Sequence, residues 1–141
     1  MNGKIKTVLL LDDNGATNII HKKFIAKTSC VEQILKFQSG VKALQYLKSE
    51  AYEQPDLIFV DINMPIMNGW EFLEELKKLK DSDKNESIVI LLSTSLSSAE
   101  REKANSIKII DEVRLKPLTV KAVQKIIVDF FPNCCVSKYP V

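Results

Sequence analysis

The stretch LIFVDINMP, residues 57–65, indicates the fold because an apolar run ends there on a carboxylate. The run Leu57 to Val60 is short and aliphatic or aromatic throughout, which is typical of a buried strand. Asp61 ends the run, and Pro65 and Gly69 follow in a segment that suits a bend. Open α/β sheets bind their ligands outside the carboxyl ends of their strands. Asp61 therefore predicts a functional site at the end of a central strand.

Four further runs predict the remaining strands. They lie at residues 7–11, 31–37, 88–92 and 109–115. Segments with helical periodicity separate these runs, and this alternation predicts an α/β fold with a parallel sheet and helices on both faces. We expect a single domain over residues 1–141, with its core at about residues 5–131 and a short tail at 132–141.

Polar residues mark the starts of three helices. Ser39 and Thr119 are suited to be N-caps, because their hydroxyls can accept a hydrogen bond from a free amide of the first turn. Ser97 and Glu100 have the spacing of a capping box. These signals predict helices that begin directly after each of these positions.

The first helix shows an apolar series. Ala16, Ile20 and Phe24 recur every four residues and are expected to form its buried face. His21 stands beside two lysines, so we expect it on the solvated face rather than as a functional histidine.

Composition limits the class of function. The chain has 141 residues, of which 45% are hydrophobic and 27% charged, enough for one sizeable core. Its net charge of +2 is too small to argue for nucleic-acid or membrane binding. No apolar run approaches the roughly 20 residues of a membrane span, and no secretory signal is visible. Cys30, Cys134 and Cys135 lack metal-ligand spacing and are expected to be reduced thiols of a cytoplasmic protein.

Charged and polar side chains follow the other strand ends. Asp12 and Asp13 end the first run, Ser93 follows the fourth, and Lys116 follows the fifth. The aspartate pair alone would also suit a turn or a helix start. In a doubly wound parallel sheet, however, all carboxyl ends lie at one edge, so we expect these residues beside Asp61.

Such a cluster predicts phosphoryl chemistry. Three carboxylates at close range repel one another, and a divalent cation with oxygen ligands relieves the repulsion. Mg²⁺ is typically held by one or two carboxylates together with phosphate oxygens. Lys116 supplies a point charge for a phosphate, and Asp61 can act as a nucleophile that forms an aspartyl phosphate.

These residues resemble the receiver domain of response regulators, the phospho-acceptor part of two-component signalling. The matching pieces are the pair Asp12-Asp13, the segment DINMPIMNG at residues 61–69, the hydroxyl of Ser93 and the pair Lys116-Pro117. The resemblance covers about the whole chain and is strongest to stand-alone receivers that carry no output domain. It implies a flavodoxin-like sheet of five strands in the order 2-1-3-4-5.

The resemblance also implies a role for each acidic residue. Asp61 would accept the phosphoryl group from a histidine kinase or a phosphotransfer protein. Asp13 would bind Mg²⁺ directly and Asp12 would bind it through water. Asp61 and the backbone carbonyl of Asn63 would be further ligands.

The remaining roles concern the switch. Lys116 would pair with the phosphoryl group, with a cis bond to Pro117, and the hydroxyl of Ser93 would move toward that group. Val113 stands where the family usually has an aromatic residue, so the readout is expected to use movement near residues 93–97. The output surface would lie roughly at residues 97–131. It would contact an unknown downstream protein or a second copy, without nucleic acid or membrane, and the chain would signal rather than act as an enzyme.

Other functions fit less well. A receiver-like binding module without phosphorylation is disfavoured by the intact Asp13, Asp61 and Lys116, although Val113 favours some change in signalling. An enzyme of the haloacid dehalogenase type would want an Asp-x-Asp motif after the first strand, where this chain has adjacent aspartates. Dinucleotide binding would need a glycine-rich turn there, and Gly15 stands alone.

Overall fold

Five parallel strands alternate with five helices in the computed structural model, which describes residues 4–49, 54–81 and 87–134. In chain order the elements are β1 Ile5–Leu11, α1 Gly15–Lys27, β2 Val31–Phe37, α2 Gly40–Lys48, β3 Leu57–Asp61, α3 Gly69–Asp81, β4 Ile88–Ser93, α4 Ser98–Asn105, β5 Glu112–Leu115 and α5 Val120–Phe130. The strands form one sheet in the order β2-β1-β3-β4-β5. This topology confirms the predicted flavodoxin-like fold.

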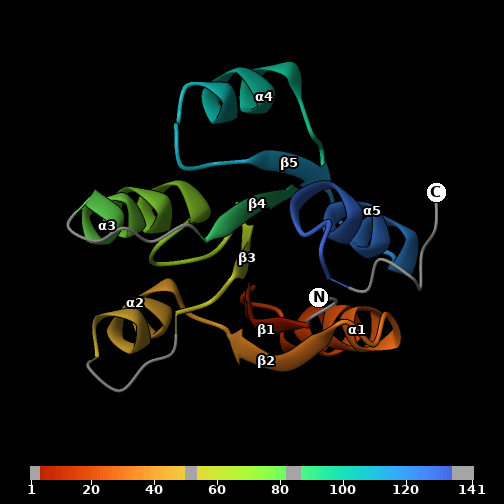
Figure 1. Cartoon of the computed structure of the whole chain (residues 1–141). Coiled ribbons are helices and arrows are strands. Elements are labelled where there is room, and N and C mark those ends of the chain that lie inside the picture. Colours follow the sequence, from red (N-terminus) through yellow and green to blue (C-terminus); the bar gives the residue numbers. More distant parts are fainter. Residues whose placement is uncertain (1–3, 50–53, 82–86, 135–141) are drawn as a thin grey trace.

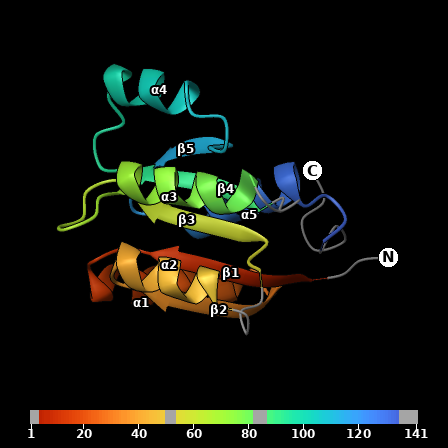
Figure 2. The ribbon, with the colours of Figure 1, turned by 90° about the vertical axis from the view of Figure 1, so that its left-hand side faces the viewer.

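The helices cover the sheet in two layers. Figure 1 shows α1 and α5 on one face and α2 and α3 on the other, while α4 lies beyond β5 at the edge. Figure 2, turned by 90°, has α2 and α3 in front of the strands. Each layer encloses its own apolar cluster, one with α2 and α3 and the other with α1 and α5. The central strands therefore have both faces buried.

This burial explains the continuous apolar runs. All five residues of β3 are buried, and Leu57, Ile58, Phe59 and Val60 are at most 1% exposed. A strand that is covered on both faces has no solvent side on which polar residues would alternate. The edge strand β2 is only half buried and carries polar residues along its length.

Three predicted N-caps are confirmed. Ser39 accepts a hydrogen bond from the amide of Lys42, and Thr119 accepts one from the amide of Ala122. Ser97 and Glu100 form the complete capping box, in which each side chain bonds the backbone of the other end.

The predicted buried face of α1 is wrong. Ala16 is exposed, Ile20 is 47% exposed, and Phe24 is half buried. The buried residues of this helix are instead Asn18, His21 and Ile25. Positions three and four residues apart also share a face of a helix, and here that face carries two polar side chains that find partners inside. The expectation that His21 is solvated is therefore wrong as well.

Two other expectations need correction. The fifth strand begins at Glu112 rather than at Ile109, and Ile109 and Ile110 pack against the core from the preceding turn.

Cys30 is fully buried and disulfide-bonded, so the expectation of reduced thiols is wrong there. Spacing along the chain does not give the Cα distances that decide pairing. Cys134 is a free thiol, and Cys135 lies outside the described residues.

The helices of this fold are short. Within the described ranges, none is long and apolar enough to cross a membrane.

Candidate functional site at the carboxyl edge of the sheet

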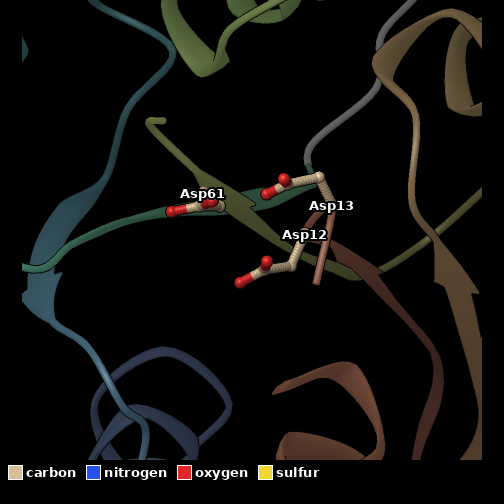
Figure 3. Close-up of side chains that lie close together, drawn as sticks. All are labelled: Asp12, Asp13 and Asp61. Carbon is tan, nitrogen blue, oxygen red and sulfur yellow. The ribbon is translucent and has the colours of Figure 1, made fainter. Parts of the chain in front are cut away.

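Three carboxylates meet where β1 and β3 end. The two strands are neighbours, with Leu11 paired to Val60, so the residues that follow them lie side by side. Figure 3 shows Asp12, Asp13 and Asp61 gathered at these ends. Each offers a carboxylate oxygen within 4.8 Å of the others. Asp12 and Asp61 are 2% exposed, whereas Asp13 is open to solvent.

Lys116 lies against two of these carboxylates. Its Nζ atom is 2.8 Å from Oδ2 of Asp12 and 3.3 Å from Oδ1 of Asp61. Burial alone would lower the pKa of Lys116, but the hydrogen bond to Asp12 and the charges of Asp61 and Asp12 outweigh it, so the pKa is raised. The lysine stays cationic and links the end of β5 to those of β1 and β3. The peptide bond to Pro117 is cis, as the resemblance implied.

Asp12 is held from both sides. Its Oδ1 atom accepts a hydrogen bond of 2.9 Å from the amide of Asn14, and its Oδ2 atom receives Lys116. Its backbone carbonyl accepts from Nδ2 of Asn18, which also donates to the carbonyl of Phe37. The buried Asn18 of α1 therefore fixes the backbone at the first residue of the acidic pair.

Asp61 has a perturbed acidity. Its pKa is raised from 3.8 to about 6, first by burial and then by the charge of Asp12, against the opposing effect of Lys116. Lys116 pairs with Asp12 and Asp61, and Asp13 adds a third carboxylate nearby, so negative charge remains uncompensated. Hard oxygen ligands with excess negative charge are the donor set that a divalent cation such as Mg²⁺ takes. The residues present therefore fit a metal ion of this kind.

The segment after β3 explains the glycine in its motif. A Cβ atom on Gly69 would lie 2.5 Å from the carbonyl oxygen of Asp61, too close for any other residue without a shift. The amide of Gly69 donates to the carbonyl of Ile62 at 2.8 Å, which closes the turn. Ile66 has a φ of 68° and is 96% exposed. Asn63 is exposed on this turn, two residues after Asp61.

Ser93 ends β4 and is 1% exposed. Its hydroxyl donates to Oε1 of Glu100 at 2.5 Å, and its Oγ atom accepts from the amides of Ser95 and Leu96. Its single hydroxyl proton is thus directed at Glu100 of α4 and not at Asp61.

His21, which was expected on the solvated face, contacts the segment that follows Lys116. Its Nε2 atom accepts a hydrogen bond of 3.1 Å from the amide of Leu118, two residues after Lys116. Burial lowers the pKa of His21, with Asp12 opposing the shift and Lys116 adding to it, so the imidazole can remain neutral and accept. The signal available was its position three residues after Asn18 and four before Ile25, on one helical face.

Relatives of known structure share this architecture. A two-component response regulator from Cytophaga hutchinsonii superposes with a TM-score of 0.84 at 37% identity, over 92% of this chain and 98% of that one. The chemotaxis protein CheY4 of Vibrio cholerae superposes with a TM-score of 0.72 at 19% identity, over 89% of this chain and 98% of that one. The second likeness supports the fold alone.

Curated relatives are similar over a shorter share of their length. The protein-glutamate methylesterase/protein-glutamine glutaminase 3 of Burkholderia thailandensis is 31% identical over 97 residues, 69% of this chain and 24% of that protein. A protein-glutamate methylesterase/protein-glutamine glutaminase of Treponema denticola is 41% identical over 71 residues, 50% of this chain and 18% of that protein. The chain thus spans no more than about a quarter of these relatives.

The family described as the response regulator receiver domain matches residues 8–128, which includes every strand end of the site. Taken with the strand order and the site at its carboxyl edge, this match shows that the chain belongs to the response regulator receiver domains of two-component signalling.

Proposed function

We propose that this receiver accepts a phosphoryl group on Asp61 and signals through protein–protein contacts. One observation carries the proposal. A carboxylate that is 2% exposed lies 3.3 Å from a lysine and within 4.8 Å of two other carboxylates. A site that only stabilised the fold would gain little from three crowded carboxylates, because their repulsion costs free energy.

Asp61 is the nucleophile in this proposal. In the transfer, a bond forms between one of its carboxylate oxygens and phosphorus, while the bond from phosphorus to the donor nitrogen of a phosphohistidine breaks. The ammonium group of Lys116, already beside Asp61, is placed to pair with the phosphoryl oxygens. The carboxylate must be ionised to attack, so transfer should weaken at acidic pH.

The acidic cluster is proposed to hold Mg²⁺. Asp13 is exposed and suits a direct ligand, with Asp61 and the backbone carbonyl of Asn63. Both oxygens of Asp12 already have partners, which supports its predicted contact through water. When bound, the cation supplies positive charge that stabilises the phosphoryl oxygens during transfer.

The phosphoryl donor is proposed to be a histidine kinase or a phosphotransfer protein. Ile19 and Ile20 support a docking place near the site, because both are nearly half exposed on α1, shortly after the acidic pair. Exposed apolar side chains beside a functional site favour contact with a partner. The downstream partner is proposed to bind α4, β5 and α5, as a different protein or a second copy. No enzymatic activity of its own is proposed for the chain.

Phosphorylation from a small donor tests the proposal. The chain is incubated with acetyl phosphate and Mg²⁺, and its intact mass is measured. We expect one phosphoryl group on the parent protein and none on Asp61→Asn. Asp129→Asn removes an exposed carboxylate of α5 and should label like the parent. Full labelling of Asp61→Asn would reject Asp61 as the acceptor. An unlabelled parent protein would leave the phosphorylation-independent binding module, the weaker candidate.

A further inference from the structure

The hydroxyl of Ser93 already donates its only proton in a hydrogen bond. A serine hydroxyl donates one hydrogen bond, and here the acceptor is Oε1 of Glu100 at 2.5 Å. The oxygen accepts from the amide of Ser95 at 3.1 Å and from that of Leu96 at 2.7 Å. Any new acceptor for this hydroxyl must therefore displace Glu100.

Glu100 does more than close a capping box. In such a box the glutamate bonds the backbone amide of the N-cap residue, and Oε1 of Glu100 does so with Ser97 at 3.2 Å. The same oxygen also accepts from the hydroxyls of Ser93 and Ser95. These donors, with that of Ser93 foremost, lower the pKa of Glu100. One carboxylate thus connects the end of β4 to the first turn of α4.

The loop between them is held in a strained conformation. Leu96 has a φ of 51°, in the left-handed region that a leucine rarely adopts. Its amide donates to Ser93 at 2.7 Å, which fixes this conformation. If the Ser93 oxygen moves, the hydrogen bond that fixes Leu96 is lost.

The helix attached to this loop is lightly packed. Ala104 is the buried residue of α4. Figure 1 shows the helix at the edge of the sheet, beyond β5. The helix also places Nζ of Lys103 4.5 Å from the ring centroid of Trp70. A change in the loop can therefore shift α4 without opening a large part of the core.

Ser93 is also next to the phospho-acceptor. Asp61 pairs with Leu92 across β3 and β4, and Ser93 is the following residue. Ser93 therefore follows the residue that is paired with Asp61 in the sheet. Its hydroxyl proton is nevertheless directed at Glu100 of α4.

We infer that Glu100 is a positioning residue that competes with a phosphorylated Asp61 for the single hydroxyl proton of Ser93. Without the phosphoryl group, Glu100 keeps Ser93 and the Leu96 loop in the arrangement seen here. With it, Ser93 donates to a phosphoryl oxygen, Glu100 loses its hydrogen bond from Ser93, and the start of α4 is released. This inference rests on the proposed phosphorylation of Asp61. It supplies a route from the site to α4 although Val113 provides no aromatic ring.

Removal of the Glu100 carboxylate should favour the state in which Ser93 donates to the phosphoryl group. The probe is beryllofluoride with Mg²⁺, a mimic of the phosphoryl group, and its affinity is measured by titration of Trp70 fluorescence, because Lys103 of α4 contacts that ring. We expect Glu100→Ala to bind the mimic roughly three- to tenfold more tightly than the parent, which is the net effect of one ordinary hydrogen bond in water. Unchanged or weaker binding would overturn the inference.

A double-mutant cycle separates competition from a general weakening of the helix. In a Ser93→Ala background no proton is contested, so the further change Glu100→Ala should leave the affinity unchanged. Ser97→Ala removes the other half of the capping box without contact to Ser93 and should bind the mimic like the parent. Tighter binding by Ser97→Ala, or by Glu100→Ala without Ser93, would show a merely structural effect and overturn the inference.

The same titration separates the two proposals. If the mimic binds none of the variants or the parent, the proposed function fails and this inference with it. If it binds the parent but the affinity does not depend on the Ser93–Glu100 pair, the inference alone fails.

Discussion

The carboxyl edge of the sheet contains two regions that are built differently. At the ends of β1 and β3, charged groups are buried and fixed: Asp12 and Asp61 are 2% exposed, and Lys116 joins them. At the end of β4, a buried hydroxyl leads into an exposed loop and a helix whose buried residue is Ala104. The first region concentrates charge where chemistry can occur, and the second region can move at low cost. A switch needs both.

The two regions should differ most in the free energy of unfolding that is lost when one charged side chain is removed. Lys116→Met should destabilise the protein by about 3 kcal/mol at neutral pH, because it leaves two buried carboxylates without their cation. The matched control is Lys125→Met, which breaks an exposed pair with Asp129 and should cost at most about 0.5 kcal/mol. Urea unfolding without divalent cations measures both. Equal, small losses would mean that the charges at β1 and β3 are not tightly coupled.

The raised pKa of Asp61 predicts that replacing this residue increases the stability of the protein by an amount that depends on pH. The folded protein binds the proton of Asp61 more tightly than the unfolded chain, since the pKa rises from 3.8 to about 6. Ionisation therefore costs stability as pH rises through this window. Asp61→Asn, which cannot ionise, should be more stable than the parent by about 3 kcal/mol above pH 6.

This advantage should disappear below about pH 4, where the parent carboxyl is protonated in both states. It should also shrink when Mg²⁺ is added, because a bound cation offsets the repulsion among the carboxylates. Thermal unfolding at several pH values makes the comparison. An advantage that grows toward acidic pH would contradict the sign of the shift.

The smallest effect is expected at α4. Lys103→Met removes the cation above Trp70 and should cost less than about 1 kcal/mol in global stability. Hydrogen exchange should nevertheless become faster in α4, whereas amides of β1 and β3 should keep their protection. Faster exchange in β1 and β3 as well would show that α4 does not behave as a separate, weakly held region.

The sequence could predict the fold because its signals are local and repeated. The apolar run at Leu57–Val60 and the capping residues Ser39, Ser97 and Thr119 each mark an element by their own chemistry. The carboxyl edge follows from topology, since parallel strands end together. This is why residues from 12 to 116 could be expected at one place, and the structure brings Asp12, Asp13, Asp61 and Lys116 together there.

Other features depend on tertiary contacts that no local signal encodes. His21 resembles a solvated residue because two lysines follow it, but it is buried and accepts a hydrogen bond from the amide of Leu118. The bond from Ser93 to Glu100 lies beside a left-handed Leu96, whose amide donates to Ser93, and sequence patterns do not predict this conformation for leucine. The strand predicted from Ile109 begins instead at Glu112, because the apolar Ile109 and Ile110 pack against the core from a turn.

The most direct measurement localises the phosphoryl group on the chain. The protein is treated with acetyl phosphate and Mg²⁺ and then with borohydride, which reduces an acyl phosphate to an alcohol, and the peptides are sequenced by mass spectrometry. The account predicts homoserine at position 61 and unmodified aspartates at positions 12 and 13. Homoserine at position 12 or 13, or no reduced residue under conditions that phosphorylate a control receiver, would contradict the claim that Asp61 is the phospho-acceptor.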